Sequence, residues 1–148
     1  MLEHFLGAEN FRKGLSNYIK KFAVSNAVTQ DLWDSLQAEA PAGVNVSHTM
    51  TTWTLQMGYP LLTVTGHDSG VLKVSQERFL AEPANKHLKF LESPFGYKWE
   101  VPLDVSCAAN FPSQQLTWLR NTDSEGMFAL VFPTDKRSSI LKFSLPRS

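Results

Sequence analysis

The sequence predicts an α+β fold, in which an N-terminal helical segment is followed by a small antiparallel β-sandwich. Apolar residues recur at helical spacing over about the first 57 residues. Beyond Tyr59 they gather in short runs separated by turn residues, which is typical of strands. Gly58 and Pro60 stand where the pattern changes, and both residue types stop helices. We therefore expect a helical portion at residues 1–57 and a β-sandwich at residues 58–148.

The first 22 residues predict two helices. Leu2, Phe5 and Leu6 indicate a short helix that ends at Gly7 and would begin upstream of Met1. A second helix is expected over residues 8–22, because its apolar residues follow the spacing i, i+4, i+7, i+8, i+11. These residues are Phe11, Leu15, Tyr18, Ile19 and Phe22.

Two further helices are predicted before the change of pattern. Thr29 is the expected N-cap of one, and Asp31 in its first turn would face the positive end of the helix dipole. Its buried stripe would be Leu32, Trp33 and Leu36. Ser47 is the expected cap of the last helix, which would bury the following residues in part: Met50, Trp53, Leu55 and Met57.

Six strands are predicted in the second part of the chain. They are expected over residues 61–65, 71–80, 97–105, 115–119, 127–132 and 139–145. The first two would pair as a hairpin around the turn residues 66–70. Pro102 lacks a backbone donor, so its position indicates a sheet edge or a bulge.

The overall composition excludes several classes of function. Lys plus Arg equals Asp plus Glu at 14 each, which disfavours binding to nucleic acid or to an anionic membrane. No apolar run is long enough to span a bilayer, and we expect no signal peptide or anchor in this chain. The single cysteine excludes an internal disulfide. A glycosylation sequon at Asn45 matters only if the chain is secreted.

No group of residues indicates a catalytic or metal site. The histidines at positions 4, 48, 67 and 87 lie far apart, and none has the spacing that a zinc site needs. His67 beside Asp68 could bind a metal or act as a base, but a solvated turn is the more common role. Cys107 is expected to be a buried structural thiol. Trp33, Trp53, Trp99 and Trp118 are expected in the core rather than in a ligand site.

Several stretches resemble the zinc aminopeptidases of the aminopeptidase N type. The most specific is WTLQMGYP at residues 53–60, preceded by FAVSNA at residues 22–27 and DLWDSL at residues 31–36. Residues 1–2, 5–7 and 11–15 match the preceding part of that family in the same order. The resemblance continues with less specificity through residues 75–79, 97–103 and 118–119.

The resemblance implies that residues 1–57 are the helical end of a thermolysin-like catalytic domain and that the sandwich is the domain behind it. The junction between them would consist of Trp53, Gln56, Met57, Gly58, Tyr59 and Pro60. Enzymes of this family use zinc to remove N-terminal residues from peptides. Their His-Glu-x-x-His zinc motif, their Gly-Ala-Met-Glu-Asn motif and their catalytic tyrosine have no counterpart in this sequence. We therefore expect no catalytic residue, metal ligand or cofactor in this chain.

Two hypotheses for the function follow. The chain is either a non-catalytic fragment of a zinc aminopeptidase or a free-standing protein-interaction module derived from one. Its expected partners are a second copy of itself, pairing through the apolar helical face, or the missing parts of the parent enzyme. Members of the family could be membrane-anchored, secreted or cytosolic, so the sequence assigns no compartment.

Overall fold

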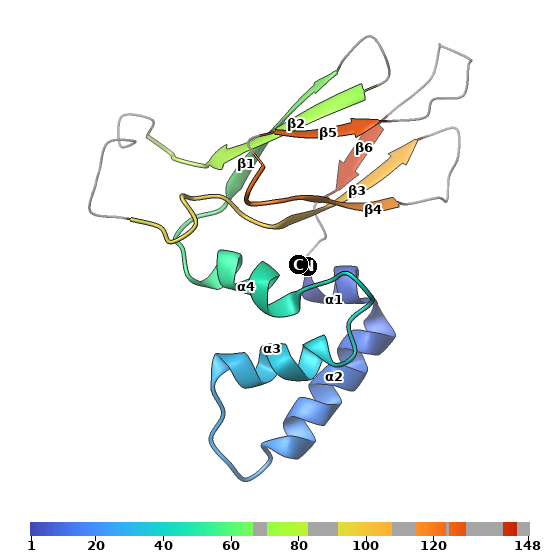
Figure 1. Cartoon of the computed structure of the whole chain (residues 1–148), viewed down its shortest axis with the longest axis vertical. Helices are drawn as coiled ribbons and strands as arrows, with labels where there is room; N and C mark the ends of the chain where they lie inside the picture. The colour runs from blue at the N-terminus through green and yellow to red at the C-terminus, as the bar shows by residue number, and fades with distance from the viewer. Residues whose placement is uncertain (67–70, 83–91, 108–114, 124, 130–140, 145–148) are drawn as a thin grey trace. The chain divides into compact units, whose positions relative to one another are not determined.

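The computed structural model confirms the α+β class, with four helices and two small antiparallel sheets (Figure 1). It describes residues 1–66, 71–82, 92–107, 115–123, 125–129 and 141–144. Two compact units can be distinguished, one with the residues up to Thr51 and one beginning at Thr52. The predicted boundary after residue 57 stays a prediction. None of the described helices is long and apolar enough to cross a membrane.

The four predicted helices are all present. They are α1 (Leu2–Leu6), α2 (Ala8–Lys21), α3 (Thr29–Gln37) and α4 (Val46–Thr54). Gly7 separates the first two with a φ of 83°, a backbone conformation that favours glycine. The buried apolar residues of the first unit come from three of these helices: Phe5, Leu6, Trp33, Leu36, Val46 and Met50.

Gly14 marks the close approach between α2 and α3. It is the buried residue of α2, and a Cβ atom added to it would lie 3.0 Å from Leu36 Cδ2 and 3.1 Å from Leu36 Cα. A side chain at this position would therefore force the neighbouring atoms of α3 to move by a few tenths of an ångström. Ile19, on another face of α2, is exposed.

Both predicted helix caps are one or two residues away from the observed ones. Val28, not Thr29, is the N-cap of α3, and its backbone N–H donates to the Asp31 carboxylate across 2.8 Å. Asn45, not Ser47, caps α4, because its Oδ1 accepts the backbone N–H of His48 at 2.9 Å. Ser47 instead donates to a side-chain oxygen of α3.

The end of α4 also differs from the prediction. The helix stops at Thr54, and the side chain of Gln56 donates to the carbonyl oxygen of Thr52 at 2.6 Å. A side chain thereby satisfies one of the carbonyls that a continuing helix would have used. Leu55 and Met57, predicted to be partly buried, are 61% and 53% exposed.

Six antiparallel strands form the two sheets of the second unit. One sheet has the order β1-β2-β5, with β1 (Pro60–Gly66), β2 (Val71–Arg78) and β5 (Glu125–Ala129). The other has the order β4-β3-β6, with β4 (Gln115–Leu119), β3 (Val101–Cys107) and β6 (Leu141–Ser144). The predicted β1–β2 hairpin is confirmed, with Val64 opposite Val74.

Two strand predictions need correction. β3 begins at Val101 rather than Tyr97, because Gly96 and Tyr97 both have positive φ and form a turn. Pro102 lies in the middle strand of its sheet, not in an edge strand or a bulge. The pairing of β3 explains why proline is tolerated there. Pro102 lies opposite Trp118 of β4 on one side, whereas on the other side the described pairing of β3 with β6 begins only at Asp104. The ends of the predicted strands at residues 130–132, 139–140 and 145 lie outside the described residues.

The core of the second unit draws on both sheets. Val74 of β2 lies in one cluster with the buried residues of the other sheet and the segment before it: Trp99, Val101, Leu103 and Leu119. Trp53 and Leu62 pack against this cluster. The predicted core positions of Trp33 and Trp99 are confirmed, whereas Trp53 and Trp118 are half-buried.

Candidate functional site

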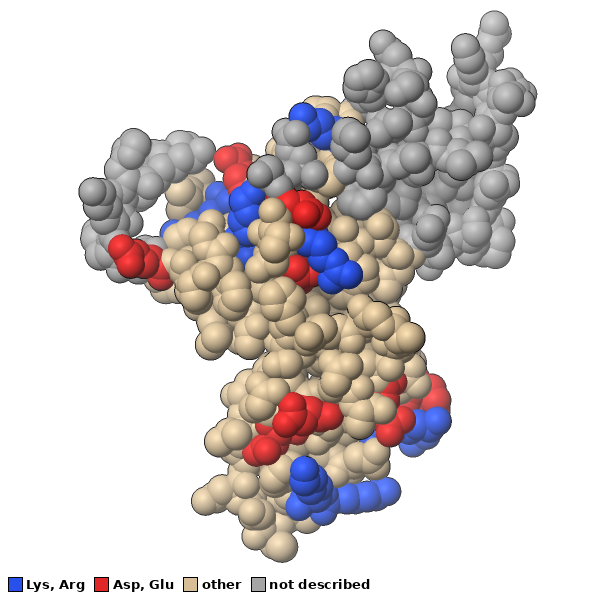
Figure 2. Space-filling view, viewed as in Figure 1, with Lys and Arg blue, Asp and Glu red and all other residues tan. Residues whose placement is uncertain are grey.

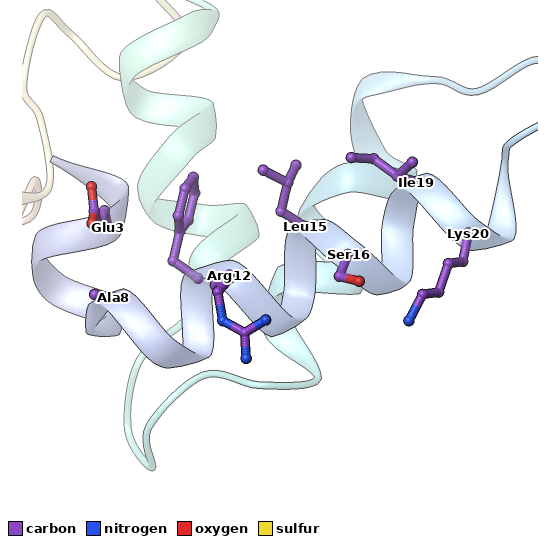
Figure 3. A pocket seen from close by; sticks show the side chains of 8 residues that line it. Glu3, Ala8, Arg12, Leu15, Ser16, Ile19 and Lys20 are labelled. Carbon is purple, nitrogen blue, oxygen red and sulfur yellow. The ribbon is translucent and has the colours of Figure 1, made fainter.

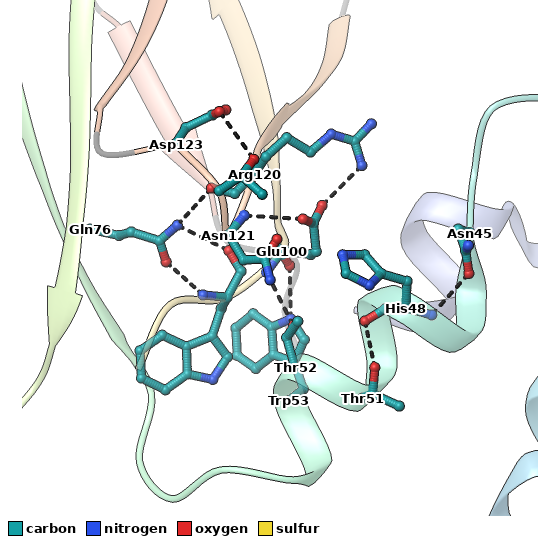
Figure 4. Close-up of polar contacts among 12 residues, drawn as sticks. Asn45, His48, Thr51, Thr52, Trp53, Gln76, Glu100, Arg120, Asn121 and Asp123 are labelled. Carbon is teal, nitrogen blue, oxygen red and sulfur yellow. Dashed lines mark hydrogen bonds and ion pairs between the residues drawn. The ribbon is translucent and has the colours of Figure 1, made fainter. Parts of the chain in front are cut away.

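The last turn of α4 and the residues after it, all within the second unit, are bound by hydrogen bonds to the segment before β3. The indole Nε1 of Trp53 donates to the carbonyl oxygen of Glu100 at 2.8 Å (Figure 4). Its ring lies 6.4 Å from that of Trp99 with an angle of 53° between the planes. Thr52 contributes a second contact, since its hydroxyl accepts the backbone N–H of Glu100. Two neighbouring residues of one helix thus hold both backbone groups of one residue.

Gln56 connects the same segment to the loop before β3. Its Nε2 donates to the carbonyl oxygen of Lys98 at 2.8 Å, and its Oε1 accepts the hydroxyl of Ser93. The Ser93 oxygen in turn accepts the backbone N–H groups of Phe95 and Tyr97. This side chain therefore determines the path of the loop that leads into β3.

The remaining residues of the predicted junction shape the entry into β1. Gly58 has a φ of 90°, in the region that glycine favours. Tyr59 stacks on Phe79 with ring centroids 4.9 Å apart and an angle of 13°. Pro60 is the first residue of β1, the strand position that tolerates proline best. Met57 is exposed, and it contributes no such contact among the described residues.

Gln76 of β2 is a buried residue that the sequence analysis did not single out. Its Oε1 accepts the backbone N–H of Trp99 at 2.8 Å, and its Nε2 donates to the Trp99 carbonyl oxygen at 3.0 Å. The same Nε2 donates to the carbonyl oxygen of Arg120 at 3.2 Å. One side chain of the first sheet therefore satisfies three backbone groups next to the second sheet. A polar residue at an inward position of an alternating strand was the signal in the sequence.

Glu100 carries a buried carboxylate in the second unit, and it too was missed. Its side chain is 2% exposed, accepts the Asn121 backbone N–H at 3.0 Å and pairs with the Arg120 guanidinium at 2.9 Å. Such a carboxylate is held by fixed donors and has no access to a substrate, so it fits a structural role rather than that of a general base. The charged position between Trp99 and Val101 was the available signal.

The described residues contain no group of three His, Cys, Asp or Glu side chains that could hold a metal ion. They therefore do not fit a zinc ion, and we derive no step through one. His4 lies in α1 and His48 in α4. His67, Asp68 and His87 are outside the described residues, as is the side chain of Cys107 at the end of β3.

The first unit has a shallow apolar groove of about 590 Å³ along α2 (Figure 3). Phe11, Leu15 and Ile19 form its apolar stripe. Its charged residues are Glu3, Arg12 and Lys20. Arg12 is held outside the stripe by a hydrogen bond of 2.8 Å to the Glu9 carboxylate. The Arg12 guanidinium keeps the pKa of the Glu9 carboxyl below its ordinary value, mainly through this hydrogen bond and next through its positive charge. The groove offers a contact surface and no chemically reactive group.

The charges of the described surface are mixed in sign. On the face shown in Figure 2, basic and acidic side chains lie near one another, and neither sign fills a continuous area among the coloured residues. This agrees with the equal numbers of acidic and basic residues in the sequence.

The chain is similar to known aminopeptidases. A model described as the peptidase family M1 domain matches residues 1–53. Aminopeptidase M1-C of rice is 39% identical over 139 residues, which are 93% of this chain and 14% of the relative. The puromycin-sensitive aminopeptidase of Caenorhabditis elegans is 41% identical over 74% of this chain, and the glutamyl aminopeptidase of pig is 43% identical over 70%. The matched segments make up 11% and 10% of those two relatives, so the chain spans a seventh or less of the length of all three.

Proposed function

Because this chain belongs to the M1 family of peptidases, we propose that it is a non-catalytic segment of a zinc-dependent aminopeptidase. Its role is to join the last helices of the catalytic domain to a β-sandwich that follows them. The parent enzyme would remove N-terminal residues from peptides, as the names of the relatives suggest. The zinc ion and the groups that activate water would be supplied by other segments of the parent enzyme.

The observation that carries this proposal concerns Trp53. It is the last residue matched by the family model, and within the second unit, to which it belongs, it donates a hydrogen bond to Glu100. The helix that carries it, α4, begins in the first unit and ends in the second. A residue in the last turn of such a helix is well placed to connect two domains. Gln56 supports the same role through Lys98.

The β-sandwich belongs to this proposal. The supporting observation is that Val74 of one sheet shares a buried cluster with Val101, Leu103 and Leu119 of the other. Two sheets that bury their facing side chains against each other in this way have the core arrangement of a sandwich.

Hydrogen–deuterium exchange of wild type and Trp53→Ala tests the joining role. We expect faster exchange in peptides from α2 and α3 as well as in peptides from β1 to β3, because a connecting residue supports both units. Tyr59→Phe, which changes an exposed side chain of the same segment, is the matched control. It should leave the exchange rates of the helix peptides and of the strand peptides unchanged. Faster exchange in the strand peptides alone would overturn the joining role.

An activity measurement tests the non-catalytic assignment separately. The purified chain is assayed on aminoacyl fluorogenic substrates with added zinc, beside a full-length M1 aminopeptidase as positive control. We expect no turnover above the buffer blank, since a hydrolytic zinc site needs three protein ligands and an open position. Chelator-sensitive turnover with stoichiometric zinc would contradict the proposal.

The exposed groove on α2 favours a second function, that of a protein-interaction module. Ile19 is 58% exposed and continues an apolar stripe along the helix. Surface of this kind drives association. The partners we propose are a second copy of this chain or other parts of the parent enzyme. Zero net charge offers little repulsion against self-association.

A further inference from the structure

We propose that two copies of this chain pair through the α2 groove in an antiparallel arrangement, with a two-fold axis passing beside Leu15. The proposal rests on the self-association proposed above and adds its surface and geometry. Phe11, Leu15 and Ile19 are spaced four residues apart, so they lie on one side of the helix and line the groove (Figure 3). Leu15 is the centre of this stripe. An axis at Leu15 places Phe11 of each copy against Ile19 of the other.

The charges at the two ends of the groove determine the direction of pairing. Glu3 lies at one end and Lys20 at the other (Figure 3). Within the described part of the chain neither side chain forms an ion pair, whereas Arg12 between them is bound by Glu9. An antiparallel pair brings Glu3 of each copy to Lys20 of the second copy, which makes two attractive contacts. A parallel pair would bring like charges together at both ends.

A second copy fits the groove because the groove is complementary to itself. A two-fold contact uses the same patch on both chains. Its apolar centre must therefore pack against its own copy, and its two charged ends must carry opposite signs. The stripe from Phe11 to Ile19, with Glu3 and Lys20 beyond its ends, meets both conditions. One helix pair is a small interface, so we expect pairing with a dissociation constant in about the micromolar range.

Sedimentation velocity over a concentration series tests the surface. Wild type is expected to shift from monomer to dimer as its concentration rises. Leu15→Glu places two carboxylates at the axis and should weaken pairing about a hundredfold. Val24→Glu, at a position that is fully exposed and outside the groove, is the matched control and should pair like wild type. Circular dichroism of each variant establishes that the helices are intact.

A charge exchange tests the antiparallel direction. Glu3→Lys and Lys20→Glu each turn both end contacts into repulsions, so each variant alone should pair roughly tenfold more weakly than wild type. An equimolar mixture of the two should recover wild-type pairing, because every contact in the mixed dimer again joins opposite charges.

The outcomes separate the proposals. A wild-type chain that stays monomeric at all concentrations overturns both the self-association and this surface. A dimer that Leu15→Glu leaves intact overturns the surface but not the self-association. A dimer that Leu15→Glu breaks, but whose charge variants do not recover on mixing, overturns the antiparallel arrangement.

Discussion

The indole nitrogen of Trp53 and the carbonyl oxygen of Glu100, 47 positions apart in the chain, lie 2.8 Å apart. Glu100 also has its backbone N–H bound by Thr52 and its carboxylate bound by Arg120. The end of α4 and the start of β3 are therefore joined through one residue whose polar groups are almost wholly withdrawn from water. The stability of the second unit should be sensitive to each partner in this group.

Removing the hydrogen bond of Trp53 while keeping an aromatic ring gives the first prediction. Trp53→Phe should lower the free energy of unfolding by about 1 to 2 kcal/mol, because the Glu100 carbonyl loses its donor. Trp53→Ala should cost roughly 3 kcal/mol, the lower end for a buried aromatic, since the side chain is only half-buried. Urea unfolding followed by circular dichroism measures both. Equal stability of Trp53→Phe and wild type would mean that the indole N–H contributes nothing.

The second prediction concerns the three backbone groups that Gln76 satisfies. Gln76→Leu keeps most of the side-chain volume but leaves the Trp99 N–H and two carbonyl oxygens without their partner. We expect a loss of about 2 to 4 kcal/mol, because buried polar groups would lose their hydrogen bonds. Gln30→Leu is the control, since its hydrogen-bond partners are exposed and can turn to water. A melting temperature equal to that of the control would refute the prediction.

The third prediction follows from the unequal exposure of the Glu100–Arg120 pair. The Glu100 side chain is 2% exposed and that of Arg120 is 43% exposed. Arg120→Gln removes the guanidinium that pairs with a buried carboxylate, whereas Glu100→Gln leaves a cation that can reach water, so the first change should cost more. We expect about 2 kcal/mol against about 1 kcal/mol, after allowing for the solvent around Arg120. A double-mutant cycle in thermal unfolding measures the coupling, and strictly additive costs would show that the pair does not interact.

The fourth prediction tests the close packing at Gly14. An alanine there would improve the helix propensity of α2, yet its Cβ would lie 3.1 Å from Leu36 Cα and from the Ser35 carbonyl oxygen. Backbone atoms cannot move aside as a side chain can, so we expect Gly14→Ala to destabilise by about 1 kcal/mol. Ser16→Ala on the same helix makes a similar gain in propensity without the contact and should be neutral or stabilising. A higher melting temperature for Gly14→Ala than for wild type would contradict this account.

The sequence predicted the elements whose signal is local. Apolar spacing located the four helices, and alternation with turn residues located the β1–β2 hairpin. The caps were misplaced because several side chains near each helix start can accept a hydrogen bond, and the choice of Asn45 over Ser47 depends on the actual backbone path. The resemblance drew attention to Trp53 and Gln56, but their partners were not predicted.

Gln76 and Glu100 were missed for a physical reason. Their described partners lie 20 or more positions away along the chain, as with the 23 positions that separate Gln76 from Trp99. The facing of the two sheets brings Gln76 to Trp99, and the pairing of β3 with β4 brings Glu100 to Arg120; no local pattern contains that information. The sequence marks both residues only as polar positions among apolar ones and gives no sign of which groups they bind.

The bonding of Gln76 has a consequence for the order of folding. Its amide exchanges both an N–H and a C=O contact with Trp99, as a residue on a neighbouring strand would, although Trp99 lies in the segment before β3, a strand of the other sheet. The pairing of β1 with β2 closes a short loop, whereas the contact with Trp99 closes a longer one and has a higher entropic cost. The hairpin should therefore form early and present Gln76 as a preformed docking point, and the segment that enters β3 should acquire its final shape late, when it reaches that amide.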